Sequence, residues 1–205
     1  ALLRYVFGWR TAVVGAMMIA ASAWHVNFSR FGMPYSIGAP LFEILTVLFL
    51  LWGLRTGRLL AFALAGVAGG LGLHTYTGFR IFPIALVIYV VYALLLGKDR
   101  MRQSLVGLLV LGAMAALVFA PLGTWAVRNW PEFSSRMGQT SVFAGKTTDA
   151  EKRAALENSL RRHVLMLNYH GDGNGRHNLP GAPALDMITG AAFIIGLGYC
   201  LYRWR

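Results

Sequence analysis

Stretches of apolar residues alternate with short polar connectors along most of the chain. A helix that crosses the hydrocarbon core of a bilayer, about 30 Å thick, needs roughly 20 mostly apolar residues. The pattern therefore predicts an all-α fold, a polytopic transmembrane bundle of about six spans. The predicted spans lie near residues 11–28, 37–54, 59–76, 80–97, 105–127 and 186–202.

Basic residues at the ends of these stretches predict the orientation of the bundle. Cytoplasmic loops of membrane proteins carry the excess of Lys and Arg. The polar stretch 128–185 is left out of the count, because long loops cross a membrane largely regardless of their charge. Of the remaining Lys and Arg, one predicted side has only Arg30 and Arg80, whereas the other side has Arg4, Arg10, Arg55, Arg58, Lys98, Arg100, Arg102, Arg203 and Arg205. We therefore expect a multi-pass protein of the inner (cytoplasmic) membrane with both chain ends in the cytoplasm.

A long polar stretch separates the last predicted span from the others. Inside it, Thr147-Thr148-Asp149 followed by Glu151 is typical of a helix start, and apolar residues then recur at helical spacing. We expect an amphipathic helix near 149–168 that lies flat at the membrane surface. The chain is thus divided into a five-span bundle (1–127), an extracytoplasmic loop (128–185), and the last span with a cytoplasmic end (186–205).

The composition agrees with a bilayer as the solvent of this chain. Hydrophobic residues make up 57% of it and charged residues 13%, which is too apolar for an ordinary soluble domain. The formal net charge of +11 raises the question of nucleic acid. Because the basic residues lie at the ends of apolar stretches and no nucleic-acid motif is present, we expect no such partner. The start at Ala1-Leu2-Leu3-Arg4, without Met, leads us to expect an internal piece of a longer protein.

Small residues follow helical spacing in the third predicted span. Ala61, Ala65 and Gly69 share one line along the helix, and Gly66 and Gly70 share the next. Small residues four apart let two helix backbones approach closely. The spacing predicts tight packing of this helix against a neighbour.

Two polar clusters lie at the predicted outer ends of spans. His25 and Arg30 close the first span, and His74, Tyr76 and Arg80 surround the turn between the third and fourth spans. A guanidinium matches phosphate oxygens and an imidazolium adds a donor, so both clusters are suited to an anionic headgroup. Ordinary interfacial anchoring explains the first cluster equally well, and a buried, hydrogen-bonded histidine is the alternative for His74.

Glu43 lies inside the second predicted span, where an ionised carboxylate is costly unless it is paired. Arg80 likewise needs an anion or an acidic partner at its depth. A salt bridge from Glu43 to Arg80 or Arg30 that only holds the bundle together is slightly favoured over direct chemistry.

A third cluster occupies the Gly-rich end of the long polar stretch. Asp172 is flanked by glycines, and His170, Arg176, His177 and Asn178 are close to it in sequence. The carboxylate suits a general base, and its spacing from the histidines is compatible with a divalent ion. The run lacks the further acids of a calcium loop and the Cys/His pairs of a zinc site, so we assign no metal ligand.

Together these runs resemble bacterial membrane glycosyltransferases of the GT-C superfamily, in particular the dolichyl-phosphate-mannose protein mannosyltransferase-like family. The resemblance rests on His25-Val26-Asn27-Phe28-Ser29-Arg30, on the run from His74 to Pro83, and on Asn168 to Asp172 with Arg176 to Pro183. It implies transfer of a sugar from a polyprenyl-phosphate donor to an acceptor on the extracytoplasmic side. We assign no cofactor, and a divalent metal stays open. The charge count places the polar clusters on that same side.

The resemblance also implies roles for individual residues. The substrate-binding candidates are His25, Arg30, His74, Tyr76, Arg80, Arg176, His177 and Asn178. The catalytic acidic residue of the superfamily usually lies on the first extracytoplasmic loop, and we expect this chain to start after that region. The catalytic residue therefore stays unassigned, with Asp172 as an accessory carboxylate.

Two other function classes stay open. A non-catalytic membrane subunit of a larger complex would also contain such helices and an outer loop. A transporter of a lipid-linked substrate would use Glu43, His74 and Arg80 along a path through the bundle, although the sequence contains no convincing internal repeat. The sugar and the acceptor are not identified by the sequence.

Overall fold

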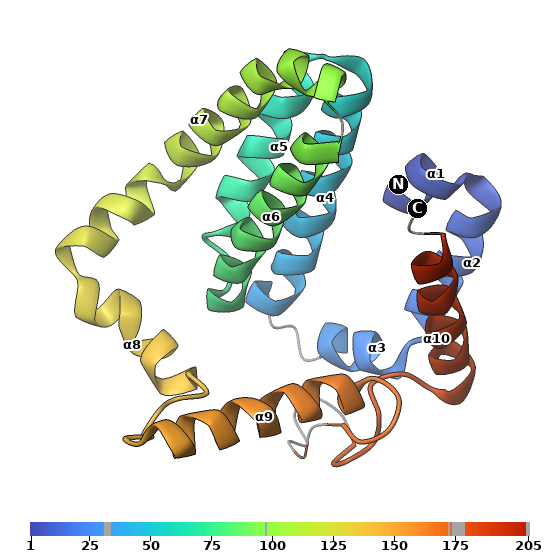
Figure 1. Cartoon of the computed structure of the whole chain (residues 1–205), viewed down its shortest axis with the longest axis vertical. Helices are drawn as coiled ribbons and strands as arrows, with labels where there is room; N and C mark the ends of the chain where they lie inside the picture. The colour runs from blue at the N-terminus through green and yellow to red at the C-terminus, as the bar shows by residue number, and fades with distance from the viewer. Residues whose placement is uncertain (31–33, 97, 172, 174–178, 204–205) are drawn as a thin grey trace. The chain divides into compact units, whose positions relative to one another are not determined.

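The computed structural model describes residues 1–30, 34–96, 98–171, 173 and 179–203, and over these residues it is helical and contains no strand. This confirms the all-α class. The elements are α1 (Leu2–Phe7), α2 (Trp9–Ala21), α3 (Ala23–Arg30), α4 (Pro34–Thr56), α5 (Leu59–Gly72), the 3₁₀ helix η1 (Thr77–Ile81), α6 (Phe82–Leu96), α7 (Lys98–Arg128), α8 (Trp130–Thr140), α9 (Asp149–Met166) and α10 (Met187–Tyr202) (Figure 1).

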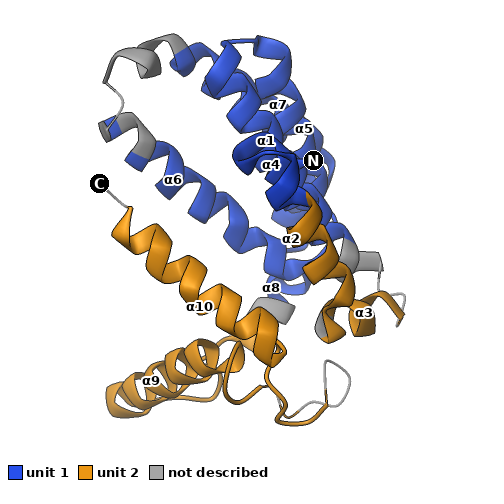
Figure 2. Cartoon of the chain, turned by 90° about the vertical axis from the view of Figure 1, so that its right-hand side faces the viewer, with its two compact units in different colours: residues 1–12, 33–137 blue, residues 13–32, 138–205 orange. Residues whose placement is uncertain are grey.

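The chain forms two compact units. Unit 1 comprises Ala1–Ala12 and Met33–Met137, and unit 2 comprises Val13–Gly32 and Gly138–Arg205 (Figure 2). Unit 1 contains the long apolar helices α4 and α7, and unit 2 contains α3, α9 and α10. The predicted divisions after residues 127 and 185 concern the two sides of a membrane and stay predictions.

Two helices in the described part of the chain are long and apolar enough to cross a bilayer, Gly38–Thr56 within α4 and Ser104–Arg128 within α7. The remaining predicted spans correspond to shorter apolar helices, namely Trp9–Ala21, Leu59–Gly72, Thr77–Tyr92 and Met187–Tyr202. A helix rises 1.5 Å per residue, so the 14 residues of α5 extend about 21 Å, less than the hydrocarbon core.

The first predicted span differs most from the expectation. The continuous helix expected over 11–28 is divided, because α2 ends at Ala21 and α3 begins at Ala23. At the break the Ser22 N–H donates to the Ile19 carbonyl oxygen, a shorter step than the α-helical one. Polar residues follow at His25, Asn27 and Ser29, so the apolar part of this segment ends near the break.

In unit 1, α5 packs against both α4 and α7 (Figure 1). Phe62 of α5 is fully buried with Leu50 and Ala65. Its ring lies against Gly53 of α4 and Gly107 of α7, and a Cβ atom added at Gly53 would approach the ring to 2.9 Å. The two glycines thus make the space that the ring fills.

Glycines of α5 also bring its backbone against α7. A Cβ atom at Gly66 would lie 2.8 Å from the Cβ of Met114, and one at Gly70 would lie 2.7 Å from the Cβ of Val118. Contacts this short leave no room for a side chain. They confirm the close helix approach that the small-residue spacing predicted.

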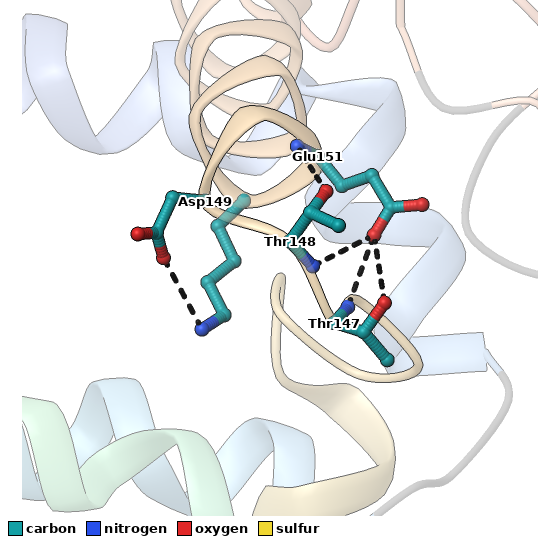
Figure 3. A network of polar contacts seen from close by, with 5 residues as sticks. Thr147, Thr148, Asp149 and Glu151 are labelled. Atoms are coloured by element: carbon teal, nitrogen blue, oxygen red, sulfur yellow. Dashed lines mark hydrogen bonds and ion pairs between the residues drawn. The ribbon is translucent and has the colours of Figure 1, made fainter.

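In unit 2, α9 begins with a capping box (Figure 3). The Glu151 N–H donates to Thr148 Oγ1 at 3.3 Å, and the Glu151 carboxylate accepts from the N–H groups of Thr147 and Thr148 at 3.0 Å each. The bonds to the carboxylate lower the pKa of Glu151 to about 2, with the Thr148 N–H as the largest cause. The helix start read from these residues in the sequence is confirmed.

The amphipathic pattern expected for α9 is weaker than the sequence reading implied. Polar and apolar residues are not separated into two faces over the whole helix, because alanines at 150, 154 and 155 are scattered around its first turns. A line of larger apolar side chains begins at Leu156 and continues through Leu160 and Val164.

Candidate functional site

The connection between α5 and α6 carries three of the predicted site residues, His74, Tyr76 and Arg80, and all three belong to unit 1. The connection is compact: the His74 N–H donates to the Leu71 carbonyl at 3.0 Å, and Thr75 Oγ1 donates to the Gly72 carbonyl at 2.6 Å. It follows directly from the end of α5 and leads into η1.

Phe79 anchors η1 on the end of α5. Its side chain is 1% exposed, and the ring lies against Gly72, where a Cβ atom would collide with it. The ring also packs on Phe82 with 5.1 Å between ring centres. Because Phe79 points inward, the position of the neighbouring Arg80 is fixed by a buried contact.

Arg80 reaches from η1 to α8. Its Nη1 donates to the Phe133 carbonyl oxygen at 3.1 Å, and its Cζ lies 3.6 Å from the centre of the Phe133 ring. The side chain is half-buried. A guanidinium on an aromatic face gains a cation–π attraction in addition to its hydrogen bond. Arg80 is therefore held in one place by two contacts with a single residue.

Arg55, at the end of α4, makes the same pair of contacts with a different aromatic residue. Its Nη1 donates to the Tyr5 carbonyl oxygen at 3.0 Å, and its Cζ lies 4.5 Å from the centre of the Tyr5 ring. Both residues belong to unit 1. The pairing joins α1 to α4, as Arg80 and Phe133 join η1 to α8.

Of the two salt bridges considered for Glu43, the one to Arg80 is not formed, and Arg30, the other candidate, belongs to unit 2. Over the described residues, the one ion pair within 4.0 Å joins Lys152 to Asp149 on α9 at 3.6 Å. The Phe133 carbonyl and ring take the place of an acidic partner for Arg80. Glu43 is half-buried on α4.

His74 is hydrogen-bonded but not buried, in contrast to the alternative considered for it. Its Nε2 lies 3.0 Å from the Val118 carbonyl oxygen of α7, and the ring meets Phe119 edge-on at 6.4 Å. A carbonyl oxygen only accepts, so Nε2 carries the proton in this contact. His74 thus connects the end of α5 to α7. The contact is at Val118, three residues before Pro121.

Tyr76 precedes η1 as its N-cap residue and is exposed. Its ring lies along Gly78, where a Cβ atom would come within 2.9 Å of it. The structure thus brings His74, Tyr76 and Arg80 to one connection, with His74 turned toward α7 and Arg80 toward α8.

His25 and Arg30 lie on α3 in unit 2, and both are exposed. They are five residues apart, which places their side chains about 140° apart around the helix axis. The two residues of the first polar cluster therefore do not share one face of α3. Their position relative to Arg80 is not described, because the residues belong to different units.

The third cluster falls almost wholly outside the described residues, which include neither Asp172 nor Arg176, His177 and Asn178. The segments that flank it are described and are paired with each other. The Gly171 N–H donates to the Gly181 carbonyl at 3.2 Å, and the N–H groups of Ala184 and Leu185 donate to the carbonyls of Met166 and Leu167 at 2.9 and 3.0 Å. We call these paired segments, 166–171 and 179–185, the loop neck.

His170 belongs to the loop neck and is exposed. A Cβ atom at Gly181 would lie 3.2 Å from its Cε1, and Gly181 has a φ of 78°, which favours glycine. Within the described residues, no group of three or more His, Cys, Asp or Glu side chains is placed to hold a metal ion. Asp172 and His177, which the divalent-ion reading needs, are not among them.

Sequence reasoning missed both partners of the α5–α6 connection. Phe133 is 53 residues away from Arg80, and the Val118 carbonyl is 44 residues away from His74. No local pattern indicates such distant pairs. A weak signal was available for Phe133. It follows Trp130 by three residues, directly after the longest apolar helix, and the two rings are in contact.

Comparisons with protein-family models, curated proteins and solved structures return no match to this chain. The resemblance to the GT-C superfamily thus rests on the motifs alone.

Proposed function

We propose that this chain is part of a membrane glycosyltransferase that moves a sugar from a polyprenyl-phosphate donor to an acceptor on the extracytoplasmic side of the inner membrane. The observation that carries the proposal is the fixed guanidinium of Arg80 at the connection between two apolar helices. The motif resemblance supplies the reaction, and the charge count supplies the side.

Arg80 suits the departing phosphate because its position does not depend on a bound substrate. In the reaction, the bond from the anomeric carbon to the lipid phosphate oxygen breaks while a bond to the acceptor oxygen forms. Negative charge grows on the phosphate, so a prepositioned cation lowers the barrier. The Phe133 carbonyl uses one of the five N–H donors of the guanidinium, and others are suited to phosphate oxygens.

The neighbouring side chains extend the proposed donor site. His74 holds the end of α5 against α7 through Nε2, and Tyr76 presents an exposed hydroxyl from the same connection. On the motif resemblance alone, His25, Arg30, Arg176, His177 and Asn178 remain proposed contacts for phosphate or pyranose. The proton of the acceptor hydroxyl passes to a carboxylate that we do not assign, with Asp172 as the accessory candidate.

The proposal is tested by comparing Arg80→Ala with Arg55→Ala in the full-length protein. The two arginines make equivalent contacts with an aromatic residue, so both variants lose a similar clamp. Thermal unfolding of the detergent-solubilised protein is followed with and without polyprenyl phosphate. We expect the lipid to stabilise the wild type and Arg55→Ala, and to lose most of this effect on Arg80→Ala.

The second readout is the transfer, in membranes, of a labelled sugar from its polyprenyl-phosphate-linked donor. Arg80→Ala is expected to abolish transfer while the amount of membrane-inserted protein stays the same. If the lipid stabilises both variants equally and transfer continues, Arg80 is only a structural clamp. If the wild type neither transfers the sugar nor gains stability from the lipid, the non-catalytic subunit becomes the better explanation.

A further inference from the structure

The larger apolar side chains of α9 form an exposed line. Leu156, Leu160 and Val164 are four residues apart and are 43%, 59% and 75% exposed. Residues at this spacing lie on one side of a helix. Leu160 and Val164 also line a shallow depression together with Leu165, Tyr169 and the charged residues Glu157 and Arg161. We call Leu156, Leu160 and Val164 the apolar line of α9.

The loop neck fixes the end of α9 beside the start of α10. The N–H groups of Ala184 and Leu185 donate to the carbonyls of Met166 and Leu167, the last residue of α9 and the one after it. Two residues later, Met187 begins α10. A Cβ atom at Gly190 in the first turn of α10 would lie 2.5 Å from Nδ2 of Asn168, so this turn packs against the neck.

The start of α10 is a boundary between polar and apolar surface. Asp186 caps the helix by accepting from the N–H groups of Ile188 and Thr189 at 3.0 Å each. Beyond it the helix is apolar and its large side chains are exposed, with Met187 at 93% and Ile195 at 72%. A helix of this kind is suited to lipid on all sides. Under the proposed function, α10 enters the bilayer at Met187.

This placement fixes the depth of α9. Because the neck holds residues 166 and 167 beside the start of α10, the end of α9 lies at the membrane boundary. Both views of unit 2 show α9 running across the direction of α10 (Figures 1 and 2). A helix that starts from the boundary and runs across a spanning helix extends along the membrane surface.

The charges beside the apolar line agree with a phospholipid surface. Arg153 continues the line toward the start of α9, and Arg161 lies on its flank, so two arginines stand against the one acid Glu157. The acids of the first turn have other partners, since Glu151 belongs to the capping box and Asp149 pairs with Lys152. Long arginine side chains reach lipid phosphates while their stems cover apolar surface.

We propose that α9 lies flat in the outer phospholipid surface, with Leu156, Leu160 and Val164 in contact with acyl chains and Arg153 and Arg161 at lipid phosphates. The inference rests on the proposed placement of α10 in the bilayer. It specifies which side of the helix faces the lipid, and that side can be measured.

The test uses spin labels on the full chain in vesicles of phosphatidylcholine and phosphatidylglycerol. Cys200, an exposed free cysteine, is first replaced by Ser. A single cysteine is then introduced as Leu160→Cys or, as a matched control on the opposite side of the same turn, as Asn158→Cys. Both positions are exposed, so the label displaces no core. Collisions with oxygen report lipid, and collisions with a water-soluble nickel chelate report water.

The expected result is an oxygen-to-nickel collision ratio several times higher at position 160 than at position 158. Equal ratios overturn the inference. It is also overturned if a label at position 160 is shielded from both reagents, because a second copy or another part of the chain then covers this side. A third label, at Ile195→Cys, tests the placement of α10 separately from that of α9. A water-exposed label at 195 removes α10 from the bilayer and with it the proposed topology. Lipid contact at 195 together with water contact at 160 refutes only the placement of α9.

Discussion

The guanidinium carbon of Arg80 lies 3.6 Å from the centre of the Phe133 ring, while Nη1 of the same side chain donates to the Phe133 carbonyl oxygen at 3.1 Å. The ring and the carbonyl hold the cation from two directions. Removal of the ring leaves the carbonyl in place, so the two contributions can be measured separately.

Phe133→Leu is expected to lower the free energy of unfolding by about 1 kcal/mol, the value of a partly desolvated cation–π contact. Phe133→Tyr keeps an aromatic face and serves as the matched control. Thermal unfolding of both variants in detergent, with and without polyprenyl phosphate, measures the effect. We expect weaker stabilisation by the lipid for Phe133→Leu, since Arg80 is then less well fixed. Identical behaviour of the two variants would contradict this role of the ring.

Gly66→Leu is expected to separate α5 from α7, because a Cβ atom at this position already meets Met114 at 2.8 Å. Overpacking of this kind costs about 1–3 kcal/mol. Gly112→Ala on α7 is the control, since a Cβ atom there has no neighbour within 4 Å. The control should be neutral or gain roughly 0.5–1 kcal/mol from helix propensity. Thermal unfolding by size-exclusion chromatography distinguishes the two, and equal melting temperatures would be inconsistent with the close approach of the helices.

His74→Leu is expected to lose the hydrogen bond to the Val118 carbonyl and about 1 kcal/mol of stability. His74→Gln retains an N–H donor of similar reach and should recover part of that loss. Thermal unfolding in detergent gives the comparison. A Gln variant no more stable than the Leu variant would show that the contact with Val118 does not contribute.

Glu151 is expected to make the start of α9 sensitive to acid. Its pKa in the folded chain is about 2, below the ordinary value of 4.5, because Thr148 and Thr147 N–H groups stabilise the carboxylate. Because the pKa is lower in the folded chain than in the unfolded chain, the ionised carboxylate stabilises the fold above pH 4.5. This stabilisation is lost as the pH falls toward 2 and the carboxylate is protonated. NMR titration of the side-chain carboxyl carbon, in full-length protein, should give a midpoint near the lower value, and the first turn of α9 should fray over the same range.

The Glu151→Gln variant should remove this pH dependence. Glu157→Gln, located further along α9, should leave it in place. A Glu151 midpoint at the ordinary value would show that the capping box does not persist in solution.

Local patterns predicted the parts of the fold that depend on neighbours in sequence. The capping residues around Thr148 identified the start of α9, and the small residues of α5 identified its close packing. The long helices α4 and α7 followed from their apolar runs. The break at Ser22 was missed because it consists of one hydrogen bond that spans three residues where an α-helix spans four. The apolar sequence looks continuous with or without such a bond.

The candidate site was predicted less completely, for a physical reason. Residue types showed that Arg80 needs a partner, and an acid such as Glu43 was the obvious choice from charge alone. The partner in the structure is Phe133, through its backbone oxygen and its ring. Every residue has a carbonyl oxygen and the chain has many aromatic rings, so residue type alone does not identify Phe133 as the partner. For His25 and Arg30, proximity in sequence suggested a shared site, but their spacing on α3 turns them to different sides.

Phe62 occupies space that belongs to two other helices, between Gly53 of α4 and Gly107 of α7. Sliding either helix along α5 would drive bulkier neighbours into the ring, and withdrawing the ring would open a void on both sides. The three helices must therefore respond to a force as one rigid body. Under the proposed function, adjustment to an arriving lipid donor falls to α6, which makes fewer contacts with this body.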